Sequence, residues 1–323
     1  MQNAAFTLGK ANHGRAKHFS SYGFTQPHHE RLLRVLKWVL AAALQYQMSV
    51  PAFAGDLTVP PPPRQNRNTE LQFALYRGYL IVADGRLGSL EHANLLLDTG
   101  TSPSMIDKSI SERLGLKGAP RPVSLFNTDV RSESVVLPDF QLGPLERHDF
   151  PVMVADFSKI SSDLGTRVDG VIGLDVLGAT SFTIDYKKRR IAFHASRQRH
   201  SVAFNAGPQF VTVDLKAGGH LLHLLLDTGT PHLVLFQDAL RHLDYDWSAT
   251  TGSGQNISGN VNYGTIILPE AQFGGENVGP QRASVVATQQ NIARDYDGLL
   301  GISVLRPTRL SFDFENRVLG WSN

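Results

Sequence analysis

The stretch Leu-Leu-Leu-Asp-Thr-Gly-Thr occupies Leu95–Thr101, and the same seven residues recur at Leu224–Thr230. Accidental repetition of seven residues is negligible in a chain of 323, so we interpret the heptad as the mark of an internal repeat. An unbroken leucine run is typical of a strand that is buried on both faces. Each copy therefore predicts a buried strand ending at an aspartate, Asp98 or Asp227, followed by a glycine that permits a tight turn.

The repeat extends beyond the heptad, with blocks in the same order at offsets of 128 to 131 residues. Asp169–Gly173 matches Asp297–Gly301, and Val136–Asp139 matches Ile267–Glu270. Blocks that keep their order at a nearly constant offset indicate a duplicated domain with small loop insertions.

Short apolar runs separated by Gly, Pro, Asn and Asp predict a mainly β fold. In each copy we expect a hairpin into the aspartate strand and then a short helix, at 107–116 and 236–243. A closing hairpin is predicted at 182–194 and at 310–321.

The predicted domain organisation follows from these patterns and from composition. We expect a signal or targeting segment at 1–54, a Pro-rich linker at 55–69, a first lobe at 70–195, a linker at 196–206 and a second lobe at 207–323.

Charge is distributed unevenly along the chain. The whole sequence carries 31 Lys and Arg against 29 Asp and Glu, but residues 1–54 hold six of the bases and one acid. The remaining 25 bases and 28 acids give a net charge of −3, so the expected partners do not include nucleic acid.

The N-terminal segment has the pattern of an export signal. Arg31, Arg34 and Lys37 precede the apolar run Trp38–Leu44, and Ala52–Ala54 offers a small-x-small cleavage site. The run is shorter than the roughly 20 residues that span a bilayer, so no stable membrane span is expected. A disordered basic tail is the alternative interpretation. A start codon assigned too far upstream would explain the unusual extension before Arg31. The predicted location is periplasmic or secreted.

The chain contains no cysteine, which excludes disulfides, thiolate nucleophiles and cysteine zinc sites. Four of the twelve histidines lie in the N-terminal segment and the others form no His-Glu-x-x-His spacing, so no metal or other cofactor is expected. No Gly-x-Ser-x-Gly motif supports a serine nucleophile.

Duplication has a chemical consequence for the two aspartates. Two copies related by an approximate twofold axis could bring Asp98 and Asp227 face to face. Carboxylates about 3 Å apart cannot both ionise cheaply, so the pair shares one proton and supplies a base and an acid together. A water between them could then attack a peptide carbonyl without a covalent intermediate.

The doubled Asp-Thr-Gly-Thr motif, followed at 75 and 74 residues by the glycine of an apolar-apolar-Gly segment, resembles the pepsin/retropepsin class of aspartic peptidases. The resemblance covers Leu71–Asn323 and looks like two tandem retropepsin-like domains. It implies a bilobal acid-protease fold, with two β-barrel-like lobes related by a pseudo-twofold axis around a cleft, in a chain able to act as a monomer.

Residue by residue, the resemblance makes Asp98 and Asp227 the catalytic pair. It implies that Thr99 and Thr228 form hydrogen bonds between the lobes, and that Thr101 and Thr230 can hydrogen-bond the outer carboxylate oxygens. Gly100 and Gly229 would let the backbone lie close to the water, beside the segments Val171–Gly173 and Leu299–Gly301.

The resemblance also implies a hairpin flap over the substrate, at Pro122–Val135 or Thr251–Ile266, and either one or two flaps remain possible. Tyr263 could be a flap tyrosine, although an ordinary strand aromatic is the simpler interpretation. Asp169 and Asp297 are not assigned to catalysis, and Asp185 and Asp313 are expected to face solvent.

We therefore expect an aspartic endopeptidase that acts on peptide or protein substrates. The alternative is an inactive or highly selective peptide-binding relative that uses the same cleft. In that case Asp98 and Asp227 would only cap backbone amides in their turns.

Overall fold

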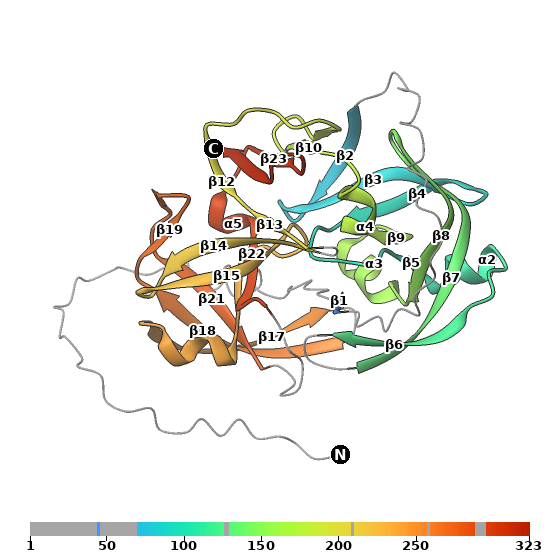
Figure 1. Cartoon of the computed structure of the whole chain (residues 1–323). Helices are drawn as coiled ribbons and strands as arrows, with labels where there is room; N and C mark the ends of the chain where they lie inside the picture. The colour runs from blue at the N-terminus through green and yellow to red at the C-terminus, as the bar shows by residue number, and fades with distance from the viewer. Residues whose placement is uncertain (1–43, 46–69, 126–128, 208–209, 257–258, 288–294) are drawn as a thin grey trace, which may run out of the picture. The chain divides into compact units, whose positions relative to one another are not determined.

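The computed structural model describes residues 44–45, 70–125, 129–207, 210–256, 259–287 and 295–323 (Figure 1). All of the predicted signal segment at 1–54 except Leu44 and Gln45, and the whole predicted Pro-rich linker at 55–69, lie outside these residues. Within the described part of the chain the fold is mainly β, with short helical segments between the strands.

The first copy of the repeat contains ten strands and three short helices. In chain order these are β2 (Glu70–Tyr76), β3 (Leu80–Leu87), β4 (Leu90–Leu97), β5 (Met105–Asp107), α2 (Lys108–Arg113), β6 (Ala119–Leu125), β7 (Asp129–Leu142), β8 (Leu145–Ala155), α3 (Ser158–Leu164), β9 (Gly170–Ile172), α4 (Leu174–Leu177), β10 (Phe182–Asp185) and β11 (Arg190–Ala192). A short strand β1 (Leu44–Gln45) pairs with β6.

The second copy begins after β12 (His200–Ala203) and β13 (Asn205–Ala206), which lie in the predicted linker. It contains β14 (Val211–Ala217), β15 (His220–Asp227), β16 (Leu233–Phe236), the 3-10 helix η1 (Gln237–His242), β17 (Asp246–Asn256), β18 (Gly259–Leu268), β19 (Ala271–Phe273), β20 (Glu276–Asn277), β21 (Gln281–Val286), β22 (Gly298–Gly301), α5 (Ile302–Leu305), β23 (Arg309–Asp313) and β24 (Val318–Ser322). Helices α2 and η1 fall where short helices were predicted.

Six strands of the first copy close into a barrel. The pairing order is β7-β8-β5-β9-β4-β3, and β3 pairs back to β7. The second copy repeats this order as β18-β21-β16-β22-β15-β14, and β14 continues to β19. In both copies the aspartate strand pairs in parallel with the strand of the apolar-apolar-Gly segment, β4 with β9 and β15 with β22.

The closing hairpins of the two copies join in one sheet. Strand β10 of the first copy pairs antiparallel with β23 of the second, so the order runs β2-β11-β10-β23-β24-β12. Phe182 and Phe312 stack across this junction with ring centroids 4.6 Å apart. A contiguous cluster of buried apolar side chains includes residues of both copies, among them Leu97 and Leu226, which precede the two aspartates. The two copies therefore share a core.

Candidate active site

Each motif aspartate is fixed at the end of a buried strand. Strand β4 leads directly into Asp98, whose amide donates to the carbonyl of Ile172 on β9 at 3.0 Å. Asp227 ends β15 and pairs with Gly301 on β22. Both aspartate residues are 0% exposed. Backbone pairing on the strand therefore sets the position from which each side chain projects.

The two carboxyl groups make matching contacts within their own turns. Oδ1 of Asp98 accepts from the Gly100 amide at 2.8 Å and Oδ2 accepts from the Thr101 hydroxyl at 2.9 Å. In the second copy, Gly229 and Thr230 donate to Asp227 at 2.7 and 2.8 Å. The identical heptads thus give two almost identical carboxyl environments.

Beneath the carboxyl groups the threonines hydrogen-bond across the two copies. The Thr99 amide donates to the Thr228 hydroxyl, and the Thr228 amide donates to the Thr99 hydroxyl, both at 3.1 Å. The Thr99 hydroxyl donates to the carbonyl of Leu226 at 2.9 Å, whereas the matching contact from Thr228 to Leu97 is 3.5 Å long. These reciprocal bonds hold the two motif loops together.

Each carboxyl group lies against the glycine of the other copy. A Cβ added to Gly100 would lie 2.5 Å from Cγ of Asp227, and one added to Gly229 would lie 2.7 Å from Oδ2 of Asp98. Any larger residue would displace the opposite carboxyl group. The structure therefore brings Asp98 and Asp227 together, with the motif glycines providing the space.

Burial raises the pKa values of both aspartates. Burial is the largest cause for each. The charge of Asp98 raises the pKa of Asp227 further, well above the ordinary range, while a hydrogen bond between the two side chains lowers that of Asp98 and raises that of Asp227. Because like charges in a buried pair cannot both persist, the two carboxyl groups share one proton.

The glycines of the apolar-apolar-Gly segments allow these segments to pack directly on the motif loops. A Cβ on Gly173 would lie 2.0 Å from the carbonyl oxygen of Thr101, and one on Gly301 would lie 2.6 Å from that of Thr230. Leu174 and Ile302 then donate their amides to the same two carbonyls. This close approach gives a physical reason for the glycine in both copies.

A pair formed by buried Ser104 and half-buried Asp175 supports the first motif loop. The Ser104 hydroxyl donates to Asp175 at 2.6 Å and its amide does so at 2.8 Å, while the Gly173 amide donates to the Ser104 hydroxyl at 3.0 Å. Burial raises the pKa of Asp175 despite these bonds. Neither Ser104 nor Asp175 was singled out from the sequence, although the two copies differ visibly there, with Asp175 after Gly173-Leu174 and Ser303 after Gly301-Ile302.

In the second copy the corresponding positions carry different chemistry. Strand register places Leu233 where the first copy has Ser104, and Ser303 where it has Asp175. His232 lies with Nδ1 3.2 Å from the Ser303 hydroxyl, and its pKa is lowered by burial and by the charge of Arg282. The two flanks of the aspartate pair therefore differ in charge.

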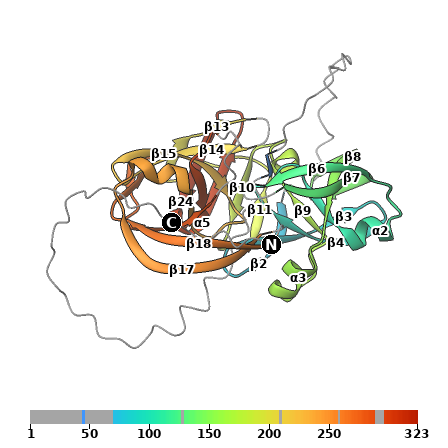
Figure 2. The same cartoon turned by 90° about the horizontal axis from the view of Figure 1, so that it is seen from below.

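Both predicted flap segments form hairpins. Strands β6 and β7 pair from Ala119 to Asp129, and β17 and β18 form a long hairpin that is visible in Figure 1 and again in Figure 2. Tyr263 on β18 is 4% exposed and packs against Gly252 of β17. It belongs to an apolar cluster with Phe236 and Tyr296, as expected of an ordinary strand aromatic.

Two other acids that recur at matching positions of the two copies have structural contacts. Asp169 and Asp297 each accept a backbone amide of the neighbouring aspartate strand at 2.8 Å, from Asn94 and His223 respectively. These bonds tie the loop before the apolar-apolar-Gly segment to the strand that carries the catalytic candidate.

The expectation that Asp185 faces solvent was wrong, because its side chain is buried in the shared sheet. Asp185 is 5% exposed, accepts the Lys188 amide at 2.8 Å and pairs with Arg309 at 3.0 Å. Burial alone would raise its pKa, but these partners outweigh burial and lower it.

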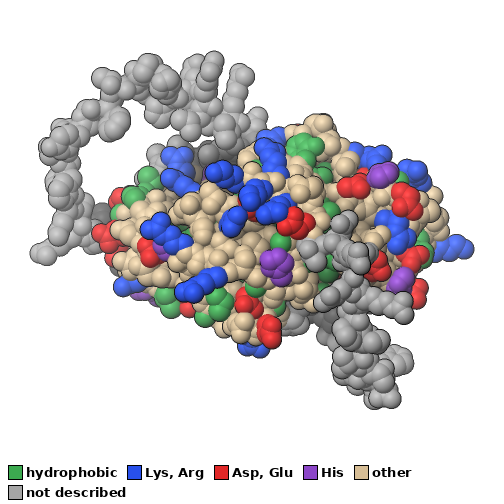
Figure 3. Space-filling view, turned by 90° about the horizontal axis from the view of Figure 1, so that it is seen from above, with side chains coloured by type: hydrophobic (Ala, Val, Ile, Leu, Met, Phe, Trp, Pro, Cys, Tyr) green, Lys and Arg blue, Asp and Glu red, His purple; other side chains and the backbone are tan. Residues whose placement is uncertain are grey.

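Lys and Arg side chains gather on the face shown in Figure 3.

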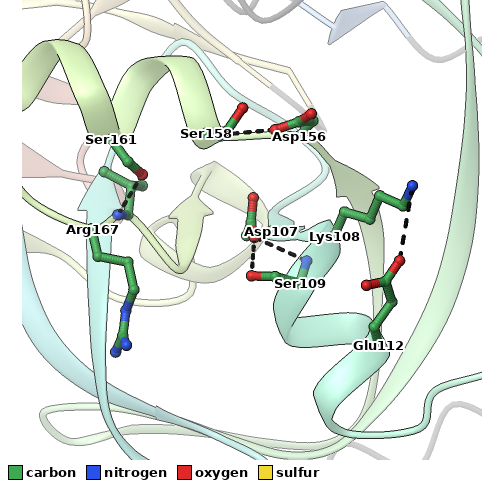
Figure 4. Close-up of a pocket in the computed structure, with 9 residues that line it drawn as sticks. Asp107, Lys108, Ser109, Glu112, Asp156, Ser158, Ser161 and Arg167 are labelled. Carbon is green, nitrogen blue, oxygen red and sulfur yellow. Dashed lines mark hydrogen bonds and ion pairs between the residues drawn. The ribbon is translucent and has the colours of Figure 1, made fainter.

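A separate hollow of about 400 Å³ lies beside α2 and α3 (Figure 4). Its charged groups are engaged in local contacts: Asp107 accepts the amides of Ser109 and Phe157, and Lys108 lies 3.8 Å from Glu112. Neither motif aspartate lines it. We assign no chemistry to this hollow.

The described residues contain neither a cluster suited to a metal ion nor a helix suited to crossing a membrane. Among the residues that the structure describes, no group of three or more His, Cys, Asp or Glu side chains is arranged to hold a metal ion. In the same part of the chain, no helix has the length and apolar character needed to cross a bilayer.

Comparison with known families adds an independent observation. A family model described as aspartyl protease, of the retropepsin-like kind, matches residues 83–176 and again residues 211–304. The two tandem matches cover more than half of the chain, and each contains one motif aspartate. No curated protein matches this sequence.

Proposed function

The chain belongs to the aspartyl protease family, and from this premise we propose that it is an aspartic endopeptidase that hydrolyses peptide bonds at the Asp98–Asp227 pair. The observation that carries the proposal is the buried pair itself, in which each carboxyl group packs against the glycine of the other copy. In this proposal the two copies are lobes related by a pseudo-twofold axis, and an extended peptide binds in a cleft between them.

The electrostatics assign a role to each aspartate. Asp227, with the more strongly raised pKa, carries the shared proton, and Asp98 is the ionised partner. Asp98 takes a proton from a water whose oxygen attacks the peptide carbonyl carbon, while Asp227 gives its proton to the carbonyl oxygen. Collapse of the tetrahedral intermediate breaks the C–N bond as the proton held by Asp98 passes to the leaving nitrogen. One hydroxyl of the intermediate returns its proton to Asp227 as the C=O bond re-forms, which restores the singly protonated pair.

The remaining motif residues keep this pair in place. Thr101 and Thr230 hold the outer carboxylate oxygens, and the Thr99–Thr228 bonds fix the distance between the loops. Such preorganisation matters because misplacing reacting groups by about 1 Å can cost roughly 100-fold in rate.

Substitution of the aspartates tests the proposal. Asp98→Asn and Asp227→Asn should each abolish cleavage of a mixed peptide library between pH 3 and 8, read by mass spectrometry of new termini. A hydroxyl-bearing peptide mimic should compete with the substrate in the wild type. Circular dichroism of both variants checks that the fold is retained.

The outcomes distinguish the enzyme from the alternative. Cleavage that survives either substitution would refute the shared-water mechanism. Peptide binding without new termini at any pH would instead identify a peptide-binding relative that does not cut.

The pH profile gives a second check. The reaction needs one protonated and one ionised carboxyl group, so the rate should fall at both ends of a bell-shaped profile. Burial and the charge of the first ionised carboxylate raise the pKa of the second ionisation, so the basic limb should lie above the ordinary aspartate pKa of about 3.8. Rates measured in buffers of constant ionic strength test this.

We also propose that the protein is exported and that residues 1–54 are removed. This proposal rests on the basic residues, apolar run and small-x-small site of that segment. N-terminal sequencing of the protein recovered outside the cytoplasm tests it, and a mature chain that starts near Met1 would refute it.

A further inference from the structure

The hydroxyl group of Tyr79 is buried and unpartnered among the residues that the structure describes. Tyr79 directly precedes β3, is 8% exposed, and its ring packs in a cluster with Leu80, Val82 and Leu96. No described group hydrogen-bonds its oxygen. A buried hydroxyl without a partner costs about 1–3 kcal/mol, so its presence needs a reason.

Strand pairing places Tyr79 next to the first motif loop. In the β3–β4 hairpin Ile81 pairs with Leu97, so Tyr79 lies two residues before this last pair and Asp98 directly follows it on the other strand. The residue therefore lies at the end of the strand pair that carries the aspartate.

The charges of both motif carboxyl groups affect the pKa of the Tyr79 hydroxyl. After burial and the opposing charge of Arg77, the charges of Asp227 and then Asp98 contribute to its raised pKa. Electrostatic influence falls with distance, so charges on both carboxyl groups act on the hydroxyl at close range. With its pKa raised, the group keeps its proton and acts as a donor throughout the working range of a carboxyl pair.

Tyr186 provides an internal comparison. Its hydroxyl is likewise buried without a partner among the described residues, but burial is the sole cause of its raised pKa. Tyr186 packs against Phe73, and neither motif aspartate contributes to its raised pKa. The same chemical group thus occurs once near the pair and once away from it.

We propose that the Tyr79 hydroxyl donates a hydrogen bond to a carbonyl oxygen of the peptide bound at the Asp98–Asp227 pair. This inference rests on the proposed function. The ring holds the donor in place before the peptide arrives, so binding satisfies a group that is otherwise unpaired. The carbonyl belongs either to the peptide backbone or to an Asn or Gln side chain, because a carboxylate there would be repelled by the ionised pair.

Tyr79→Phe tests the inference, with Tyr186→Phe as the matched control. Both remove one buried hydroxyl and keep the ring. In the full chain, Tyr79→Phe should lower kcat/KM about 2- to 12-fold, mainly through KM, and weaken binding of a statine-type peptide mimic by a similar factor. Tyr186→Phe should leave both quantities within 2-fold of the wild type, and both variants should melt no lower than the wild type.

Matched peptides identify the source of the carbonyl. Peptides that differ only by Asn or Leu on either side of the cleaved bond are compared in the wild type and in Tyr79→Phe. An equal loss for all peptides indicates a backbone carbonyl, whereas a loss confined to the Asn peptides indicates a side-chain amide.

The failure of this inference is distinguishable from that of the proposed function. If the wild type cleaves peptides and Tyr79→Phe equals Tyr186→Phe in kcat/KM and inhibitor binding, the inference alone is overturned. If the wild type binds the mimic without cutting any peptide, the endopeptidase proposal fails and the binding comparison still decides on Tyr79. A wild type that binds neither peptide nor mimic overturns both.

Discussion

The two copies of the repeat agree closely at the motif loops and diverge at the barrel perimeter. In the first copy β7 is one strand of 14 residues that pairs with β6, β8 and β3, so hydrogen bonds close the ring. In the second copy the corresponding run is divided into β18 and β19 around Pro269–Glu270, and the partner strand is divided into β20 and β21 before Pro280. Proline alone does not cause the break between β18 and β19, because β7 continues through Pro138, the equivalent of Pro269.

At the motif loops, by contrast, corresponding carboxylate contacts differ by only 0.1 Å between the copies. The perimeter needs only to cover a core, and several strand arrangements do so. The loops must each fit against the other, so a change in one copy affects the other. We infer that the contact between the two motif loops, rather than the fold of each copy, limits which residues the repeated heptad can contain.

The largest expected effect that tests this equivalence comes from the motif glycines. Gly100→Ala and Gly229→Ala should each lower kcat/KM about 100-fold or more, because the added Cβ would displace the opposite carboxyl group. The two losses should be similar in size. Steady-state kinetics measure them.

Gly207→Ala is the control for the glycine variants, because a Cβ there would meet no atom closer than 3.8 Å. Wild-type activity in either motif variant would show that the carboxyl group facing it is not needed, and would break the equivalence of the copies.

A smaller effect should reveal an asymmetry in the threonine bonds. Thr99→Val should destabilise the protein more than Thr228→Val, because the Thr99 hydroxyl donates at 2.9 Å and the Thr228 hydroxyl at only 3.5 Å. Each variant also leaves a buried amide without its acceptor, so losses of about 1–3 kcal/mol are expected. Denaturant unfolding measures the difference.

Thr180→Val serves as the control for the threonine variants, since its hydroxyl makes only a weak local bond at 3.4 Å. Equal losses for Thr99 and Thr228 would mean that the two long-range bonds are equivalent despite their lengths.

The smallest expected effect separates the two aspartates by stability. A group whose folded pKa is raised binds its proton more tightly in the folded state, so its contribution to stability falls as the pH rises above the ordinary aspartate pKa of about 3.8. Asp227→Asn removes this penalty and should raise the melting temperature at neutral pH. Asp98→Asn should raise it less, because the pKa of Asp98 is raised less.

Melting temperatures from pH 4 to pH 8 check this, at about 2–4 °C per kcal/mol for domains of this size. Asp185→Asn should show the opposite sign: its folded pKa is lowered, so the variant should lose stability at neutral pH and the loss should shrink as the pH falls. A larger gain for Asp98→Asn would reverse the assignment of the proton carrier.

Local patterns predicted much of this molecule because they act within a few residues. The leucine runs, the hairpins before the motifs and the short helices after them all follow from apolar periodicity and turn residues. The prediction that Asp185 faces solvent was wrong because the surroundings of this residue are set by a segment far along the chain. Its burial depends on Arg309 from the other copy, and no pattern near Asp185 contains that residue.

The sequence by itself determined that a mainly β unit is duplicated and that an aspartate ends a buried strand in each copy, because these properties are written in adjacent residues. The tertiary structure alone decided that the two carboxyl groups lie against each other's glycines, that Ser104 meets Asp175, and that the Tyr79 hydroxyl lies buried near the pair. These relations join segments that are far apart along the chain. Their distances are set by the packing of the two copies on one core, which no local pattern specifies.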